Sequence, residues 1–171
     1  VVNKIESKLS ANSVATTCGV DEDLIIELTD NDDNPIANAT VSVKLDGVKN
    51  YTADENGQIR ISSGSIAPGS YIAKISFEDD YYVASAIETA VVINKIESKL
   101  SANSVATTCG ADEDLIINLT DVDGKPIANA SVSVKLDGVK NYTTDENGQI
   151  RISSSSIAPG SYIAKISFED E

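Results

Sequence analysis

Histidine, tryptophan and methionine are absent from the 171-residue sequence, which has only two cysteines and two phenylalanines. The absence of histidine removes the commonest general acid–base group and a frequent metal ligand. No Ser–His–Asp or Cys–His set can therefore be assembled, and the sequence contains no glycine-rich phosphate loop. We expect no catalytic residues and no metal-ligating residues, and thus a protein that is not an enzyme and needs no cofactor.

Positive charge is also scarce, with 13 Lys and Arg residues against 27 Asp and Glu residues and a net charge of −14. Such a field repels duplex nucleic acid and anionic membranes, so neither is an expected partner. The sequence has no run of 18 apolar residues, and we expect no membrane insertion of this segment. It begins at Val1-Val2 without a signal-peptide pattern, which is typical of an internal fragment of a longer protein.

The sequence does contain an internal tandem repeat. Residues 3–80 recur at 94–171, shifted by 91 positions, with nine differences in 78 aligned residues. A period of that length fits one whole small domain, and small domains in series are typical of stalks and adhesive arrays. We assign the first repeat to residues 1–92 and the second to residues 93–171. The differences are Val20/Ala111, Glu27/Asn118, Asn31/Val122, Asp33/Gly124, Asn34/Lys125, Thr40/Ser131, Ala53/Thr144, Gly64/Ser155 and Asp80/Glu171.

Each repeat consists of short segments in which apolar and polar residues alternate, separated by turn signals. About seven short strands per repeat predict an all-β fold of two tandem immunoglobulin-like β-sandwiches. The second repeat stops at Glu171, before a counterpart of the 82–93 segment, so we expect it to lack its last strand. The predicted strands of the first repeat are 4–9, 13–17, 24–28, 41–45, 59–61, 71–77 and 82–93.

The differences between the repeats test this strand register. Glu27/Asn118 and Thr40/Ser131 fall at outward positions of predicted strands, and the other seven fall in predicted loops or at the end. We therefore expect no difference at a residue that points into the core.

A tyrosine follows a proline turn at the start of the penultimate predicted strand, Tyr71 after Pro68-Gly69 and Tyr162 in the second repeat. This position is typical of the tyrosine corner of immunoglobulin-like domains, in which the hydroxyl bonds upstream backbone. Simple core packing of the two rings is the alternative.

Several blocks of the sequence also resemble a known family. They are LIIELTD at 24–30, PIANATVSVKLDGV at 35–48, DENGQI at 54–59 and APGSY at 67–71, with close variants in the second repeat. In order and spacing they resemble the bacterial-type Ig-like repeats of adhesin-like surface proteins from methanogenic archaea. The resemblance implies a long, secreted, extracellular cell-surface chain that displays tandem modules for adhesion. Where that family leads us to expect an aromatic residue after Thr16-Thr17, this sequence has Cys18, and Cys109 in the second repeat.

The two cysteines admit two interpretations. Each is a small buried hydrophobe, or each forms an intermolecular crosslink to a laterally packed chain. A disulfide requires Cα atoms within about 7 Å, whereas Cys18 and Cys109 occupy equivalent sites one domain apart. They cannot pair with each other in an extended chain, and the acidic stretch 21–23 disfavours a reactive thiolate.

Asn-x-Ser/Thr sequons, the acceptors of N-glycosylation, occur twice per repeat, each in or beside a predicted turn. Plain turn-forming asparagines are the alternative. The candidate glycosylation sites are Asn38, Asn50, Asn129 and Asn141.

The acidic turn at 30–34 (DNDDN) offers hard oxygen ligands for Ca²⁺. Its counterpart at 121–125 (DVDGK) replaces three of the five residues and adds a lysine. A site needed in every module would not survive that change, so Ca²⁺ is disfavoured.

The sequence thus predicts a non-enzymatic structural and adhesive module of a cell-surface repeat protein, an adhesin stalk whose partners include neighbouring repeats. The alternative is a self-associating subunit of an extracellular fibre or sheath, assembled by strand addition, cysteine crosslinks or both. A glycan-binding module is a third class, for which the candidate aromatic residues are Tyr51, Tyr81 and Tyr82. The sequence names no host or cell-surface ligand.

Overall fold

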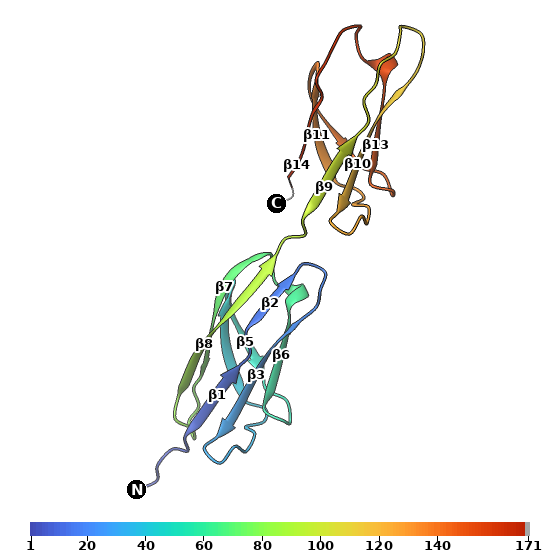
Figure 1. Cartoon of the computed structure of the whole chain (residues 1–171). Helices are drawn as coiled ribbons and strands as arrows, with labels where there is room; N and C mark the ends of the chain where they lie inside the picture. Colours follow the sequence, from blue (N-terminus) through green and yellow to red (C-terminus); the bar gives the residue numbers. More distant parts are fainter. Residues whose placement is uncertain (170–171) are drawn as a thin grey trace. The chain divides into compact units, whose positions relative to one another are not determined.

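A computed structural model describes residues 1–169 of the chain (Figure 1). The chain divides into two compact units, Val1–Ile96 (unit 1) and Glu97–Glu171 (unit 2). Strands and two short 3₁₀ turns make up the regular structure of the described residues, which confirms the predicted all-β class. Within that range no helix has the length and hydropathy needed to cross a membrane.

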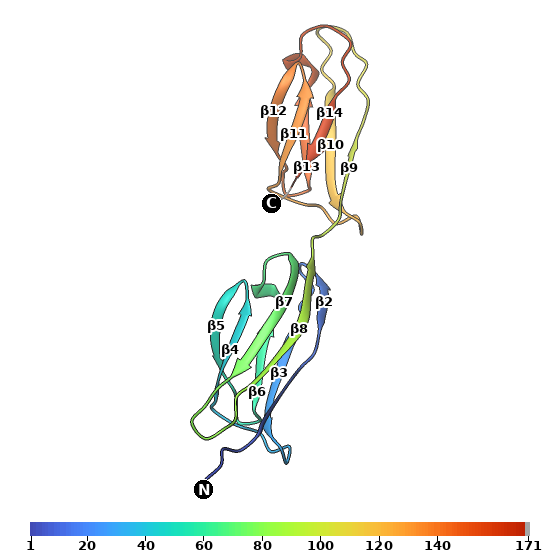
Figure 2. The ribbon, with the colours of Figure 1, turned by 90° about the vertical axis from the view of Figure 1, so that its left-hand side faces the viewer.

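Unit 1 is a sandwich of two sheets, one with the strand order β1-β3-β6 and the other with the order β2-β8-β7-β4-β5. Its pairs are antiparallel except for β2 and β8, which run parallel. These orders correspond to the A-B-E and G-F-C-C′ sheets of an immunoglobulin-like sandwich, with β2 added beside β8. Figure 2 shows β8 between β2 and β7. The strands are β1 (Ser7–Ala11), β2 (Val14–Thr17), β3 (Asp23–Asp30), β4 (Thr40–Leu45), β5 (Gly47–Thr52), β6 (Gln58–Ser62), β7 (Gly69–Phe77) and β8 (Ser85–Asn94).

The core of unit 1 lies between the inner faces of the two sheets. Alternate residues of β3 and β7 point inward and are almost fully buried, because side chains of a strand alternate between its two faces. Each fully buried aliphatic or aromatic side chain stabilises the fold by about 1.5–3 kcal/mol. The largest fully buried side chains in this unit are Phe77, Leu24, Ile26, Leu28, Ile75, Val14, Val41, Val43 and Val91.

Unit 2 repeats most of this plan with fewer strands. Its sheets have the orders β13-β10-β9 and β12-β11-β14, and its buried core is correspondingly smaller. Residues 105–108, the counterparts of β2, form no strand, and the described residues include no counterpart of β8. The strands are β9 (Ser98–Ala102), β10 (Asp114–Asp121), β11 (Ser131–Leu136), β12 (Gly138–Thr143), β13 (Gln149–Ser153) and β14 (Lys165–Phe168).

The structure corrects the sequence-based picture in three places. β5 and β12 are strands that the pattern did not predict. The predicted boundary between residues 92 and 93 falls inside β8, whereas the units meet between Ile96 and Glu97. The expectation that no repeat difference lies in the core is wrong, because Ala53 and Thr144 are each only 2% exposed. Of the other differences, Asp80/Glu171 involves a residue outside the described range.

Candidate functional site

The first and last parts of unit 1 are joined by parallel pairing. In β2 and β8 the register runs from Val14 opposite Val91 to Thr17 opposite Asn94. The Cys18 amide donates to the Asn94 carbonyl at 2.9 Å and extends the pairing by one residue. We call this contact, residues 14–18 with residues 91–94, the β8 seam.

A second parallel contact lies before β1. Ile5 forms a parallel bridge with Tyr82. Its amide donates to the Tyr81 carbonyl at 2.9 Å, and the Val83 amide donates to the Ile5 carbonyl at 2.8 Å. The Ser7 hydroxyl adds a bond to the Val83 carbonyl at 2.6 Å. The entering segment is thus held to the leaving segment at two places along its length.

The parallel direction of β2 and β8 determines how unit 1 responds to tension. Two parallel strands at opposite ends of a domain are pulled in opposite directions when tension acts along the chain, so they must slide past each other. Sliding loads the evenly spaced hydrogen bonds of the parallel β8 seam together, whereas an antiparallel hairpin pulled at its open end separates from that end and breaks one bond at a time. Val14 and Val91, 1% and 0% exposed, must also leave the core in that step.

Tyr71 lies at the start of β7, where a tyrosine corner is expected. Its hydroxyl donates to the Ala67 carbonyl, four residues upstream, at 3.0 Å. Tyr162 in unit 2 is 39% exposed, and its hydroxyl has no hydrogen-bond partner among residues 1–169. The two units thus differ beside the strand position that β8 fills.

Both cysteines are free thiols, in different environments. Cys18 is half-buried and packs against the core of unit 1. Cys109 is exposed, and the segment before it has no strand to pair with in the described part of unit 2. A crosslink at either thiol stays a prediction.

All four sequon asparagines are exposed, as are the hydroxyl residues two positions later. Asn38 and Asn129 adopt positive φ angles of 55° and 56°, conformations that asparagine tolerates better than most residues. Asn50 and Asn141 lie in the edge strands β5 and β12. Glycosylation at these positions is geometrically accessible and stays a prediction.

The acidic turn at 30–34 is organised by its own backbone. Asp30 Oδ1 accepts hydrogen bonds from the amides of Asp32 and Asn34, each at 2.9 Å, and the Asn34 side chain also donates to this carboxylate. These bonds, that of the Asn34 side chain first, hold the pKa of Asp30 below its ordinary value of 3.8. Asp121 in unit 2 accepts from Asp123 and Lys125 in the same way. Across residues 1–169, no group of three or more acidic, cysteine or histidine side chains is arranged to hold a metal ion.

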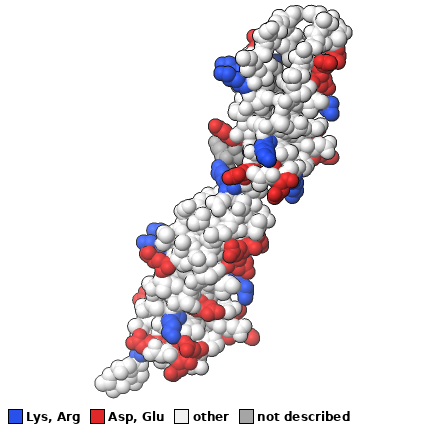
Figure 3. Space-filling view, viewed as in Figure 1, with Lys and Arg blue, Asp and Glu red and all other residues white. Residues whose placement is uncertain are grey.

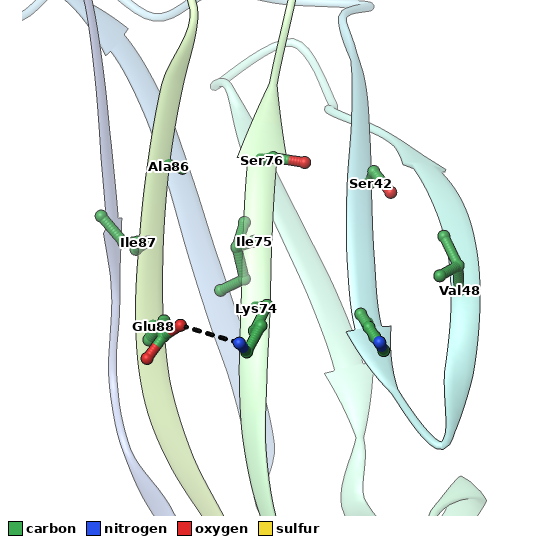
Figure 4. A pocket seen from close by; sticks show the side chains of 9 residues that line it. Ser42, Val48, Lys74, Ile75, Ser76, Ala86, Ile87 and Glu88 are labelled. Atoms are coloured by element: carbon green, nitrogen blue, oxygen red, sulfur yellow. Dashed lines mark ion pairs between the residues drawn. The ribbon is translucent and has the colours of Figure 1, made fainter.

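A shallow open hollow of about 460 Å³ lies on the outer face of the larger sheet of unit 1 (Figure 4). Lys74 on β7 forms an ion pair with Glu88 on β8 at 3.3 Å across it, and both side chains are more than half exposed. Lys44 lies directly opposite Lys74 in the β4–β7 register. An exposed pair of this kind contributes little stability. Through Glu88, however, β8 neutralises the charge of Lys74, one of the two facing lysines.

The three tyrosines that are candidates for glycan binding differ in their exposure and do not form one exposed aromatic surface. Tyr82 packs against Phe77 with ring centroids 5.9 Å apart, Tyr51 is half-buried, and Tyr81 is exposed. On the face shown in Figure 3, Lys and Arg side chains are scattered among the acidic ones. That face has no gathered basic surface of the kind that nucleic acid requires.

Comparison with known proteins gives structural likenesses only. No family model matches the sequence, and no curated protein matches it. A segment of a 1.5-MDa bacterial ice-binding adhesin is matched over 98% of this chain and 60% of that chain, at 14% identity and a TM-score of 0.39. The D0-D1 domain of intimin is matched over 96% and 91%, at 17% identity and 0.38. The adhesin InvE of Yersinia pseudotuberculosis is matched over 86% and 50%, at 15% and 0.37.

These solved structures include adhesin segments, and the chain spans about 60% of the first one. At such identities and TM-scores the likeness says nothing about ligand or activity.

Proposed function

We propose that this chain is a non-enzymatic, load-bearing module of a secreted cell-surface repeat protein, an adhesin-type stalk that needs no cofactor. The observation that carries the proposal is the parallel β8 seam between the entering and leaving strands of unit 1. An array of such units transmits tension along the chain while each unit resists by shear. A stalk requires that property, and catalysis does not.

Three further features support an extracellular stalk. The sequence repeats one unit and so supplies length by duplication. Its net charge of −14 keeps parallel chains apart and soluble. Its four sequons are exposed, which suits a glycoprotein whose sugar chains stand away from the sandwich.

A self-associating fibre subunit is the second candidate function. It is favoured by the exposed thiol of Cys109 and by the unpaired side of β14 in the described residues. In that function cysteine crosslinks or added strands would join neighbouring chains.

Sedimentation velocity and negative-stain electron microscopy of the whole chain separate the two. The stalk proposal predicts a monomer at all protein concentrations, with and without reductant. Concentration-dependent polymers, or disulfide-linked species on non-reducing gels, would overturn the stalk proposal in favour of the fibre.

A further inference from the structure

The two units differ most where β8 lies. In unit 1, β8 has β7 on one side, in antiparallel register from Gly69 opposite Ile93 to Phe77 opposite Ser85, and β2 on the other. In unit 2, β14 pairs with β11 on one side only, and no strand of the described residues lies on its other side. The sequence repeat thus supplies a filled and an open version of one site.

The open version exposes the side chains that β8 covers in unit 1. Ile75 and Phe77 are 1% and 2% exposed in β7, whereas their counterparts Ile166 and Phe168 are only partly buried. Val105 is likewise partly buried, although its counterpart Val14 is 1% exposed. These side chains form an apolar strip in unit 2 that a strand with inward apolar residues would bury. Unit 1 uses Ile87, Val91 and Ile93 for this purpose.

Unit 2 also keeps the hydrogen bonds that position a backbone acceptor for the added strand. In unit 1 the Thr89 hydroxyl of β8 donates to the Asn12 carbonyl at 2.9 Å. The Asn12 side chain is held by the Asp23 carbonyl and the Ile25 amide, at 3.0 and 2.6 Å. Asn103 makes the same two bonds, to Asp114 and Ile116, at the same distances. The acceptor for the incoming threonine is therefore already positioned.

The lysines beside this site favour an incoming strand that carries an acidic residue. Lys165 lies opposite Lys135 in the β11–β14 register, so two like charges face each other. In unit 1 the corresponding lysine, Lys74, is neutralised by Glu88 of β8 at 3.3 Å. Lys165 has no ion-pair partner among residues 1–169. A strand with an acidic residue at this register position relieves the repulsion.

We propose that the free side of β14, with residues 105–108, is a strand-accepting site whose occupant is a second copy of the β8 segment, residues 83–95. The added strand runs antiparallel to residues 162–168 and parallel to residues 105–108. Its glutamate faces Lys165, and its Val91 equivalent lies between Val105 and Tyr162. The inference does not rest on the proposed stalk function, because it concerns only how unit 2 binds a strand.

The test is binding of a synthetic peptide, VASAIETAVVINK, to the whole chain, measured by calorimetry and by amide hydrogen exchange. We expect one peptide per chain, because unit 1 already holds its own β8. Amide protection should rise at residues 105–108 and 162–168 and stay unchanged in unit 1. Absence of saturable binding up to about 1 mM peptide, or two sites per chain, would overturn the proposal.

Charge reversal tests the register without touching the core. Lys165 is exposed, so Lys165→Glu leaves the fold intact and should weaken binding of the natural peptide by about two- to fivefold. A peptide carrying Glu88→Lys should bind this variant better than it binds the natural chain. Failure of the double reversal to restore affinity would contradict the proposed register.

A covalent version keeps the test decisive if the free peptide aggregates. The sequence of residues 81–95 is joined after Glu171, and a matched chain carries the same extension with Val91→Asp. We expect slower exchange of the core amide of Ile117 with the natural extension only. Equal exchange in both extended chains would overturn the proposal.

Discussion

Exchanging one buried residue between the repeats should move the stabilities of the two units in opposite directions. Ala53 and Thr144 occupy equivalent positions, each 2% exposed. The Thr144 hydroxyl donates to the Ile127 carbonyl at 2.8 Å and accepts from the Ala130 amide at 2.9 Å. Ala53 has no hydroxyl to offer the corresponding amide of Ala39. The perturbations are therefore Thr144→Ala in unit 2 and Ala53→Thr in unit 1.

The magnitude follows from these contacts. Each buried hydrogen bond contributes about 0.5–1.5 kcal/mol net, and the lost methyl group adds about 0.8 kcal/mol. Thr144→Ala should thus lower the free energy of unfolding of unit 2 by about 2–4 kcal/mol. The backbone bonds around both positions match, at 2.9 Å from residues 53 and 144 to the carbonyls of Ala39 and Ala130. Because the backbone is already shaped for threonine, Ala53→Thr should stabilise unit 1 by about 1 kcal/mol.

Residue-resolved amide hydrogen exchange on the whole chain measures both effects at once, and each unit serves as the control for the other. We expect faster exchange of the Ala130 amide in Thr144→Ala and slower exchange of the Ala39 amide in Ala53→Thr. Destabilisation by both substitutions, or an unchanged Ala130 amide in Thr144→Ala, would refute the reasoning.

Three other predictions follow from local contacts. The pKa values of Asp21, bonded first by Ser62, and of Asp30 lie below their ordinary value of 3.8. The two ionised carboxylates should therefore stabilise unit 1 at pH values above 3.8, and this contribution should be lost as the pH falls below 3.8. Urea midpoints of unfolding measured against pH check this. Gly57→Ala should destabilise unit 1 by about 1–2 kcal/mol, since φ is +69° and a Cβ would lie 2.5 Å from a carbonyl oxygen; an unchanged melting temperature would contradict this. Tyr71→Phe should cost about 0.5–1.5 kcal/mol through loss of its bond to Ala67, whereas Tyr162→Phe should be near neutral, as judged by denaturation of the two variants.

The sandwich is predictable from the sequence because inward apolar residues alternate regularly with outward residues in the strands that contain Leu24 and Ile75. β5 was not predicted because it is an edge strand whose six residues are exposed or half-exposed, so apolar and polar residues do not alternate along it. Ala53 was predicted to lie in a loop, and the local pattern gives no sign that tertiary packing leaves it only 2% exposed.

The parallel pairing of β2 with β8 could not be predicted from the sequence pattern. Periodicity identifies strands but not their partners, and nothing local in Val14–Thr17 indicates parallel pairing with Val91–Asn94.

Single-molecule pulling on unit 1 within the whole chain, in two directions, most directly tests the proposal that the β8 seam carries tension. In a Cys18→Ser, Cys109→Ser background, handles at Asn3 and Asn94 load the seam in shear, whereas handles at Ser70 and Asn94 unzip β7 from β8. Both pairs of handles act on the same fold. We predict a clearly higher rupture force for the first pair than for the second. Equal rupture forces, or a lower force in shear, would contradict the account of this chain as a module built to carry tension.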